Sequence, residues 1–346
     1  MSARSSICEQ CGTAAWQHAL TWFDGLIGPM MEGGFAWLTP PALTFWFEQY
    51  WQKPFIFFRL LKPTADFLLS EIPIRSACFI TEARKRGMEV LNLRGPFGGT
   101  NHFWLIYKGK KFAFEGLPSA GFLGTRRSLM VDDKARTKKE LSRQDWPVAQ
   151  SRSFWFFQYY SALRYSRQLG FPLVVKPRHG TYARHITTDI RTLEALKTAL
   201  KTAFAYGPSV VIERYLAAAS VVRITVVDYA WLAAVERITP NVLGDGTHSV
   251  SELVVQKNSD PGRGEPDDET KTVYRVILDS VSDQLLTQKG YTRTSIPKKG
   301  ERVELQADPF IRLGADLKDV TDVVHPDTAA LCQKIAEHFG VRLVGI

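Results

Sequence analysis

The stretch from Phe171 to Gly180, FPLVVKPRHG, joins a buried-type strand to a basic turn. Its β-branched apolar run, Leu173-Val174-Val175, is typical of a buried strand, and Lys176 follows it directly. A lysine in this position carries a compact positive charge that suits an anionic ligand. The alternative is that Lys176 is simply solvated. The pattern therefore raises the question of which anion would bind there.

Regular elements surround this stretch. A lysine-rich segment before it, DDKARTKKEL, predicts the start of a helix, and Arg191 to Tyr206 predicts an amphipathic helix after it. Gly207-Pro208 ends that helix, and SVVIERYL predicts the next strand. The predicted order is therefore helix, strand, glycine turn, helix, strand.

The residues before about position 130 are more irregular and rich in aromatic side chains. They contain an αβ stretch from Phe79 and the segment WLIYKGKKFAFEG, which predicts a hairpin around Lys108-Gly109. Much later, GDG at Gly244 to Gly246 also predicts a hairpin turn.

The composition bounds the class of protein. With 346 residues the chain is long enough for about two domains, and a hydrophobic content of 45% allows a sizeable core. The formal net charge of +9 favours anionic partners, but it does not choose among nucleotides, acidic peptides, nucleic acid and lipid headgroups. The basic residues are scattered and match no nucleic-acid-binding motif, so we expect no nucleic-acid partner and keep a nucleic-acid binder only as an alternative.

The cysteines and the apolar stretches bear on the compartment. Four cysteines do not make a disulfide framework and no signal peptide is evident, so we expect a cytoplasmic protein. Cys8-x-x-Cys11 with His18 lacks the second ligand pair of a structural zinc site, so we expect no metal there. Gly33 to Leu61 is apolar but interrupted by prolines and charges, so it does not give the roughly 20 residues of a spanning helix. We therefore expect no membrane partner.

Four further blocks carry a specific resemblance. They are NVLGDGTHSVSELV (Asn241 to Val254), KNSDPGRG (Lys257 to Gly264), IPKKGERVEL (Ile296 to Leu305) and DVTDVVHPD (Asp319 to Asp327). Together with the order of elements, they make residues 128–346 resemble the ATP-grasp superfamily, in particular the ATP-grasp module of cyanophycin synthetase and of glutamate-cysteine ligase/glutathione synthetase fusions. The resemblance implies a two-lobed α+β ATP-grasp fold that is C-terminally incomplete, with lobes at 128–206 and 207–346. Residues 1–127 would form an N-terminal, pre-ATP-grasp-like domain of uncertain fold.

The resemblance also implies a function. ATP-grasp ligases move the γ-phosphoryl group of ATP onto a carboxylate and let an amine attack the acylphosphate, a reaction that depends on positioning and charge neutralisation. The implied cofactors are ATP and Mg²⁺, the implied substrates are amino acids or peptides, and a homo-oligomer is compatible with the resemblance. The alternative is a non-catalytic ATP-binding or regulatory protein, which would bind ATP without producing ADP.

Site residues follow from the matched positions. Lys176 would contact the α- and β-phosphates, Gly180 would belong to the loop that covers them, and the earlier nucleotide lysine would be Lys134 or, next, Lys138. The remaining positions are the hinge residues beside adenine, Glu213, Arg214 and Tyr215, and the arginines facing the phosphates and the substrate carboxylate, Arg223 and Arg237. The structural alternatives are an exposed helix face for Lys134 and Lys138, ordinary strand positions for Arg223 and Arg237, and a structural ion pair at Glu213.

Three of the departures from the family pattern bear on the nucleotide and magnesium sites. The loop RHGTYARHI keeps only Gly180 where the family has several glycines, so we expect Arg178, His179, Arg184 and His185 to supply charge instead. LAAASVVRI lacks the acidic ribose contact, which implies weaker nucleotide affinity. The chain stops at Ile346, before the family's aspartate, glutamate and asparagine ligands for magnesium, so we expect a truncated or partner-completed site and poor ligase activity from these residues alone.

Overall fold

The computed structural model describes residues 8, 17–23, 25–26, 50–96, 98–117, 131, 133–180, 184–216, 221–266 and 268–346. By its contacts the chain divides into two compact units, each with its own sheets and cores. Unit 1 comprises residues 1–40, 124–219 and 338–340, and unit 2 comprises 41–123, 220–337 and 341–346. The domain boundaries expected from the sequence stay predictions.

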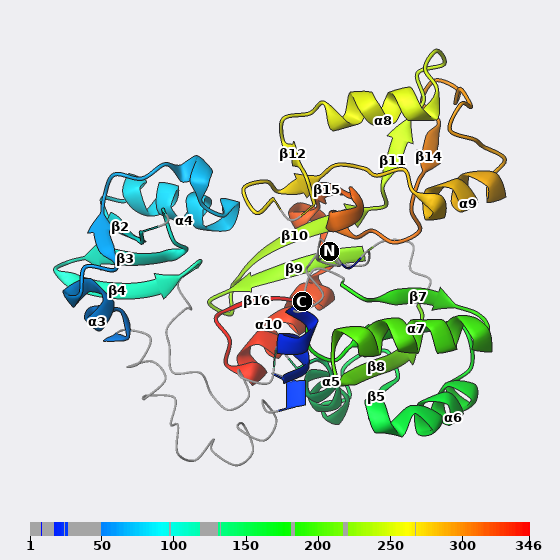
Figure 1. The fold of residues 1–346 in the computed structure, drawn as a ribbon, viewed down its shortest axis with the longest axis horizontal. Coiled ribbons are helices and arrows are strands. Elements are labelled where there is room, and N and C mark those ends of the chain that lie inside the picture. Colours follow the sequence, from blue (N-terminus) through cyan, green and yellow to red (C-terminus); the bar gives the residue numbers. More distant parts are fainter. Residues whose placement is uncertain are drawn as a thin grey trace, which may run out of the picture. The chain divides into compact units, whose positions relative to one another are not determined.

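Unit 1 is built on a four-stranded antiparallel sheet (Figure 1). In spatial order its strands are β5 (Ser151–Trp155), β8 (Ser209–Arg214), β6 (Leu173–Pro177) and β7 (Thr187–Ile190). Its described helices include α5 (Lys134–Arg143), α6 (Tyr159–Leu169), preceded by the 3₁₀ turn η3 (Phe156–Gln158), and α7 (Leu193–Tyr206), and residues 17–23 are also helical. The two helices and two strands predicted between DDKARTKKEL and SVVIERYL are all present.

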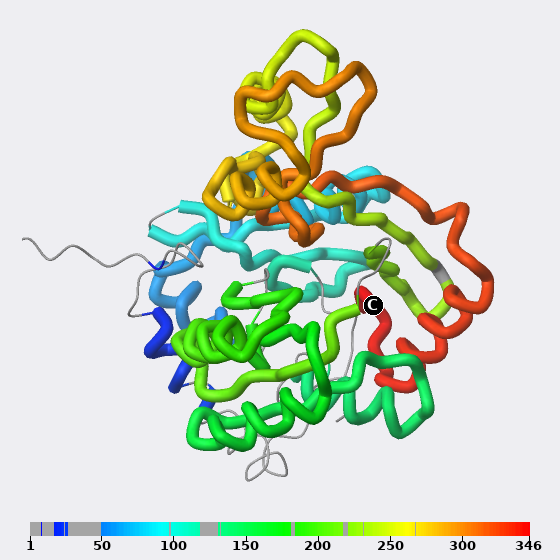
Figure 2. The backbone as a smooth tube through the Cα atoms, turned by 90° about the vertical axis from the view of Figure 1, so that its right-hand side faces the viewer, coloured from blue at the N-terminus to red at the C-terminus, as the bar shows by residue number. Residues whose placement is uncertain are grey.

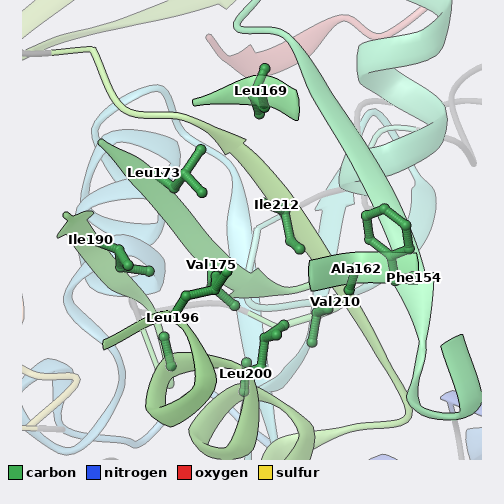
Figure 3. Packing of buried hydrophobic residues seen from close by; sticks show 12 residues of the cluster. Phe154, Ala162, Leu169, Leu173, Val175, Ile190, Leu196, Leu200, Val210 and Ile212 are labelled. Atoms are coloured by element: carbon green, nitrogen blue, oxygen red, sulfur yellow. The ribbon is translucent and has the colours of Figure 1, made fainter. Parts of the chain in front are cut away.

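The core of unit 1 follows from the alternation of side chains along β6. Successive residues of a strand point to opposite faces of a sheet. Leu173 and Val175 are fully buried in one cluster with Leu196 and Leu200 of α7, as Figure 3 shows. Burying each such side chain stabilises the fold by about 1.5–3 kcal/mol. Since Leu173 and Val175 face this cluster, Val174 and Lys176 belong to the opposite face.

The N-terminal part of unit 2 contains a second antiparallel sheet with α4 (Ile74–Lys85) packed against it. The strands are β1 (Lys62–Thr64), β2 (Glu89–Arg94), β3 (His102–Tyr107) and β4 (Lys110–Glu115), and the short α3 (Gln52–Phe57) and the 3₁₀ turn η1 (Leu69–Glu71) precede α4. Lys108 and Gly109 between β3 and β4 have φ of 48° and 72°. Two positive φ angles are the signature of a type I′ turn, which confirms the predicted hairpin.

The other four-stranded sheet of unit 2 has the order β15 (Asp316–Asp319), β10 (Trp231–Ile238), β9 (Val221–Val227) and β16 (Leu343–Gly345). It packs against α10 (Pro326–Phe339), where Cys332 is buried beside Ile224 and Val226 as a core residue. The connections around it include the 3₁₀ turns η4 (Ile311–Leu313) and η5 (Thr321–Val323). The strand β16 leads to the C-terminus marked in Figure 2.

The remaining part of unit 2 consists of short strand pairs and two helices, namely β11 (Asn241–Leu243) with β14 (Arg302–Glu304), β12 (Arg263–Gly264) with β13 (Val273–Tyr274), α8 (Val250–Asn258) and α9 (Ser280–Gln288). The hairpin predicted at Gly244 to Gly246 is wrong. The chain passes from β11 into α8, and β11 pairs with the distant β14. Asp245 turns the chain by accepting hydrogen bonds from the amides of Thr247 and His248.

The apolar segment from Gly33 to Leu61 lies largely outside the described residues. Within the described ranges, every helix is too short or too polar to cross a bilayer.

Candidate functional site

Two lysines and one glutamate form a charged cluster in unit 1. Lys176 Nζ lies 2.7 Å from Glu213 Oε1, and Lys138 donates to the other oxygen, Oε2. The exposed fractions of the side chains are 17% for Lys176, 19% for Lys138 and 11% for Glu213, so all three are largely buried but reach solvent. The cluster carries a net charge of +1, because two ammonium groups share one carboxylate.

Strand register explains why these side chains meet. In the pairing of β6 with β8, Glu213 lies opposite Val174 and Val211 lies opposite Lys176. Residues two apart in a strand share a face, so Lys176 and Glu213 are diagonal neighbours on the face turned away from the apolar core. Lys138 reaches the same carboxylate from α5. The cluster therefore needs one helix and two strands that are distant in sequence.

The cluster has shifted pKa values. Burial acts to raise the pKa of Glu213, but the positive charges of Lys176 and Lys138 outweigh it and hold that pKa below its usual value. Burial also lowers the pKa of Lys138, with Lys176 adding to the effect and Glu213 opposing it. Glu213 thus stabilises the charged form of Lys138 against the effect of burial.

A second charged contact lies at the start of α5. The carboxylate of Asp133 caps the helix by accepting from the amides of Ala135 and Arg136, and the Arg178 guanidinium binds both of its oxygens. Lys134 Nζ donates to the carbonyl oxygen of Gly180 at 2.6 Å. Asp133, Lys134 and α5 therefore hold the turn that follows Lys176.

Gly180 itself is required by geometry. Its φ is 126°, and a Cβ at this position would lie 3.0 Å from a ring carbon of Tyr206. L-residues rarely adopt this backbone conformation, so glycine is the residue that fits both the turn and its neighbour.

Two of the predicted hinge residues, Arg214 and Tyr215, donate hydrogen bonds to backbone carbonyl oxygens. Arg214 is exposed, and its Nη2 donates to the carbonyl oxygen of Leu169 at the end of α6. The amide of Tyr215 donates to the carbonyl oxygen of Pro172 at 3.0 Å. Because Arg214 follows Glu213 in the strand, its side chain belongs to the opposite face from the lysine cluster.

Arg223 and Arg237 lie in unit 2, on one face of the β9–β10 pair. Arg223 is opposite Val235, and Arg237 is two residues further along β10, so the two arginines are diagonal neighbours. Burial lowers the pKa of Arg237, and the charge of Arg223 lowers it further. Two cations on one face of a sheet are suited to an anionic ligand.

Two of the four basic residues expected to supply charge to the loop, Arg178 and His185, are instead engaged with other groups. Arg178 is paired with Asp133, and His185 is 2% exposed with its Nδ1 2.9 Å from the carbonyl oxygen of Thr202. Sequence reasoning also missed Asp133. Its signal was available, since an aspartate immediately before a predicted helix is a favourable N-cap.

Magnesium has no evident ligands in these clusters. Mg²⁺ prefers carboxylate and water oxygens in octahedral geometry. Within the described residues of the two clusters, both carboxylates are engaged, Glu213 by two lysines and Asp133 by Arg178. The lysines fit a polyphosphate anion, whereas no magnesium ligand is assigned.

Comparisons with known proteins were made for the whole chain, and no protein-family model matches it. The chain is 32% identical over 273 residues to cyanophycin synthetase from Nostoc sp., covering 77% of this chain and 29% of that protein. It is 31% identical over 221 residues to the glutathione biosynthesis bifunctional protein GshAB from Streptococcus agalactiae, covering 63% of this chain and 29% of that protein. The chain therefore spans less than a third of the length of these relatives.

The structural comparison agrees with the sequence comparison. The crystal structure of a bifunctional glutathione synthetase from Pasteurella multocida matches 80% of this chain and 36% of that chain, with a TM-score of 0.56 and 26% identity.

The fold and these relatives define the class: the chain belongs to the ATP-grasp superfamily, with the α+β fold expected from its sequence. Ligases of this superfamily use ATP and Mg²⁺. Within the superfamily, the chain is a homologue of cyanophycin synthetase and of the bifunctional glutathione enzymes.

Proposed function

We propose that this chain is an ATP-dependent carboxylate-amine ligase that joins an amine to an amino-acid or peptide carboxylate. The observation that carries the proposal is the cluster in which Lys138 and Lys176 share Glu213. Both ammonium groups are held in place before any ligand arrives, so little side-chain entropy is lost when an anion replaces part of their pairing. The relatives named above support the same class of reaction.

In the proposed reaction, Lys138 and Lys176 bind the phosphate oxygens of ATP and neutralise charge during transfer. A carboxylate oxygen of the substrate attacks the γ-phosphorus, the bond to the β-phosphate oxygen breaks, and ADP leaves. The amine then attacks the acyl carbon, loses a proton, and displaces inorganic phosphate. Electrostatic stabilisation by fixed donors commonly supplies a few kcal/mol per donor.

The proposal also covers the binding of the carboxylate substrate, the oligomeric state and the location in the cell. Arg223 and Arg237 would bind the substrate carboxylate, because a guanidinium binds a carboxylate through two parallel hydrogen bonds. Small amino-acid or peptide substrates, a homo-oligomeric state and a cytoplasmic location belong to this proposal, with no nucleic-acid or membrane partner.

The test is ADP release with ATP and Mg²⁺, scanned over pairs of amino-acid or peptide carboxylates and amines, by the purified chain and by a version extended through any codons that follow Ile346 in its gene. Substrate-stimulated ADP release, with a product whose mass equals acid plus amine minus water, is expected. Lys176→Met should lower the rate by about 100-fold or more. Lys201→Ala, an exposed lysine of α7, is the matched control and should leave the rate unchanged.

The competing function has its own outcome in this assay. Calorimetric ATP binding that depends on Lys176, together with no ADP release by either version for any substrate pair, would identify a non-catalytic nucleotide-binding protein. Absence of both ATP binding and ADP release would reject the nucleotide site.

A further inference from the structure

A cluster of soft and borderline metal-binding groups lies in unit 1, apart from the lysines. The thiol of Cys8 and the imidazoles of His18 and His185 bring one ligand atom each within 4.8 Å of the others. Cys8 is a free thiol. The three residues come from position 8, a helical segment at 17–23 and the turn before β7, so the fold brings together groups that are up to 177 positions apart.

The best-defined pair in this cluster has the spacing of two ligands of one tetrahedral ion. Cys8 Sγ lies 3.5 Å from His185 Nε2. A zinc ion bound by sulfur at about 2.3 Å and by nitrogen at about 2.05 Å, with a tetrahedral angle, separates these two atoms by about 3.6 Å. The thiol and the imidazole are therefore already at the separation that a shared ion would impose.

His185 is oriented as a metal-bound histidine is oriented. Its other ring nitrogen, Nδ1, lies 2.9 Å from the carbonyl oxygen of Thr202 in α7. A hydrogen bond from Nδ1–H to a backbone carbonyl fixes the tautomer in which Nε2 carries the lone pair. The Nε2 atom is the one that faces Cys8, so the geometry presents an acceptor nitrogen to the centre of the cluster.

Contacts with neighbouring rings restrict the positions of both imidazoles. The rings of His18 and His185 meet edge to face with centroids 5.0 Å apart, and each also contacts the ring of Tyr206.

We propose that Cys8, His18 and His185 form a transition-metal site whose preferred ion is Zn²⁺. One thiolate and two imidazoles suit zinc, and three protein ligands leave one tetrahedral position for water or a further group. The sequence argued against a metal here because Cys8, Cys11 and His18 lack a second ligand pair. His185 supplies the missing distant ligand, and Cys11 lies outside the described residues.

A metal at this position would cross-link the N-terminal segment to the core of unit 1. The helical segment at 17–23 already contacts that core, since Trp22 Nε1 donates to the carbonyl oxygen of Phe204 at 2.9 Å. Tyr206, which contacts both histidines, is also the neighbour that restricts position 180 to glycine. The ion would therefore stabilise the region beside the turn that Lys134 holds.

The test measures metal content without any nucleotide. The full chain, purified without chelator and dialysed against buffer with a trace of Zn²⁺, should contain about one zinc per chain by mass spectrometry of the metal. After replacement with Co²⁺, thiolate-to-cobalt charge-transfer absorption should appear in the near ultraviolet. Cys8→Ser should abolish that absorption, and Cys8→Ser, His18→Gln and His185→Asn should each weaken zinc binding about 10-fold or more.

Controls separate loss of the site from loss of the fold. Asparagine is chosen at position 185 because His185 has a φ of 54°, a conformation that asparagine tolerates. Cys78→Ser and His325→Gln change exposed residues of the same types and should keep full zinc content. Zinc should raise the melting temperature of the wild type and not that of the three site variants.

Two results would overturn the proposal. One is a wild-type chain that takes up no stoichiometric Zn²⁺ or Co²⁺. The other is a Cys8→Ser chain that keeps both full zinc content and the zinc-dependent rise in melting temperature. Neither measurement depends on ATP, so the metal site and the ligase function can fail separately.

Discussion

Arg178 binds both carboxylate oxygens of Asp133, with Nε 2.9 Å from Oδ1 and Nη2 2.5 Å from Oδ2. The two residues are 45 positions apart, and their side chains are 13% and 6% exposed. A bidentate pair of this kind ties the end of β6 to the start of α5.

The first prediction is that Asp133→Asn lowers the free energy of unfolding at neutral pH by about 3 kcal/mol, because it leaves a largely buried guanidinium without its counter-ion. Asparagine remains a good N-cap, so the loss reports mainly the ion pair. Urea unfolding measures it, and Asp145→Asn, at an exposed aspartate of the same unit, is the control. A change below about 0.5 kcal/mol would show that the pair contributes little.

The second prediction concerns the pH dependence of the same pair. Burial acts to raise the pKa of Asp133, but the hydrogen bonds from Arg178 and from the amide of Arg136 outweigh it, so the folded pKa lies below the ordinary 3.8. A carboxylate with a depressed pKa contributes stability above its unfolded pKa and loses it as the pH falls through the folded value. The stability difference between wild type and Asp133→Asn should therefore be constant near neutrality and shrink below about pH 4. A difference that instead grows in acid would contradict this assignment.

The third prediction is that Glu213→Gln lowers the free energy of unfolding at neutral pH by about 3 kcal/mol, because two buried ammonium groups then face each other without a carboxylate. Removing Glu213 also removes the charge that opposes the depression of the Lys138 pKa. A lysine with a depressed pKa destabilises the folded state less as the pH rises toward its unfolded-state pKa. Part of the lost free energy of unfolding should therefore be regained by about pH 9.5. Glu337→Gln, an exposed glutamate, is the control. Equal losses at both pH values would argue against coupled lysines.

The fourth prediction is that Lys176→Met weakens ATP binding by about 1–3 kcal/mol, or about 5- to 150-fold in Kd, through loss of charge-assisted hydrogen bonds to phosphate. Methionine keeps most of the aliphatic stem, so packing changes little. Isothermal calorimetry measures the affinity, and Lys201→Ala is the control. Unchanged ATP affinity would place the phosphates elsewhere.

The fifth prediction is that Arg237→Lys raises the KM for the carboxylate substrate about tenfold while the KM for ATP changes less than about twofold. Lysine keeps the charge but loses the planar fork that binds a carboxylate through two hydrogen bonds. Arg302→Lys, at an exposed position of β14, should change neither constant. Equal increases in both constants would indicate a general structural defect.

The elements of unit 1 could be predicted from the sequence because their signals are local. Apolar alternation gives β6, a leucine repeat gives α7, and Gly207-Pro208 marks its end. The contacts of the charged residues could not be predicted in the same way. Glu213 lies beside Lys176 only because of the register of β6 with β8, which no local pattern specifies.

Two other differences have equally physical reasons. GDG has the composition of a hairpin turn, but β11 finds its partner about 60 positions later in β14, so tertiary pairing decided the outcome. His185 stands among basic residues, which suggested an exposed charge, yet its ring is buried against Thr202 and Tyr206. The local composition of both segments was misleading, because distant parts of the chain determine which residues they contact.

The alternation along β6 makes this strand unequally tolerant of different kinds of genetic change. Replacing Leu173 or Val175 by another aliphatic residue keeps the face of every side chain, so such point substitutions should be accepted with small losses. Deleting a single residue between Phe171 and Lys176 would shift the register by one, so that Lys176 would face the apolar cluster and Pro177 would take its place beside Glu213. Natural or laboratory variants of this chain should therefore differ in residue identity across these positions, whereas insertions and deletions within the strand should be rare.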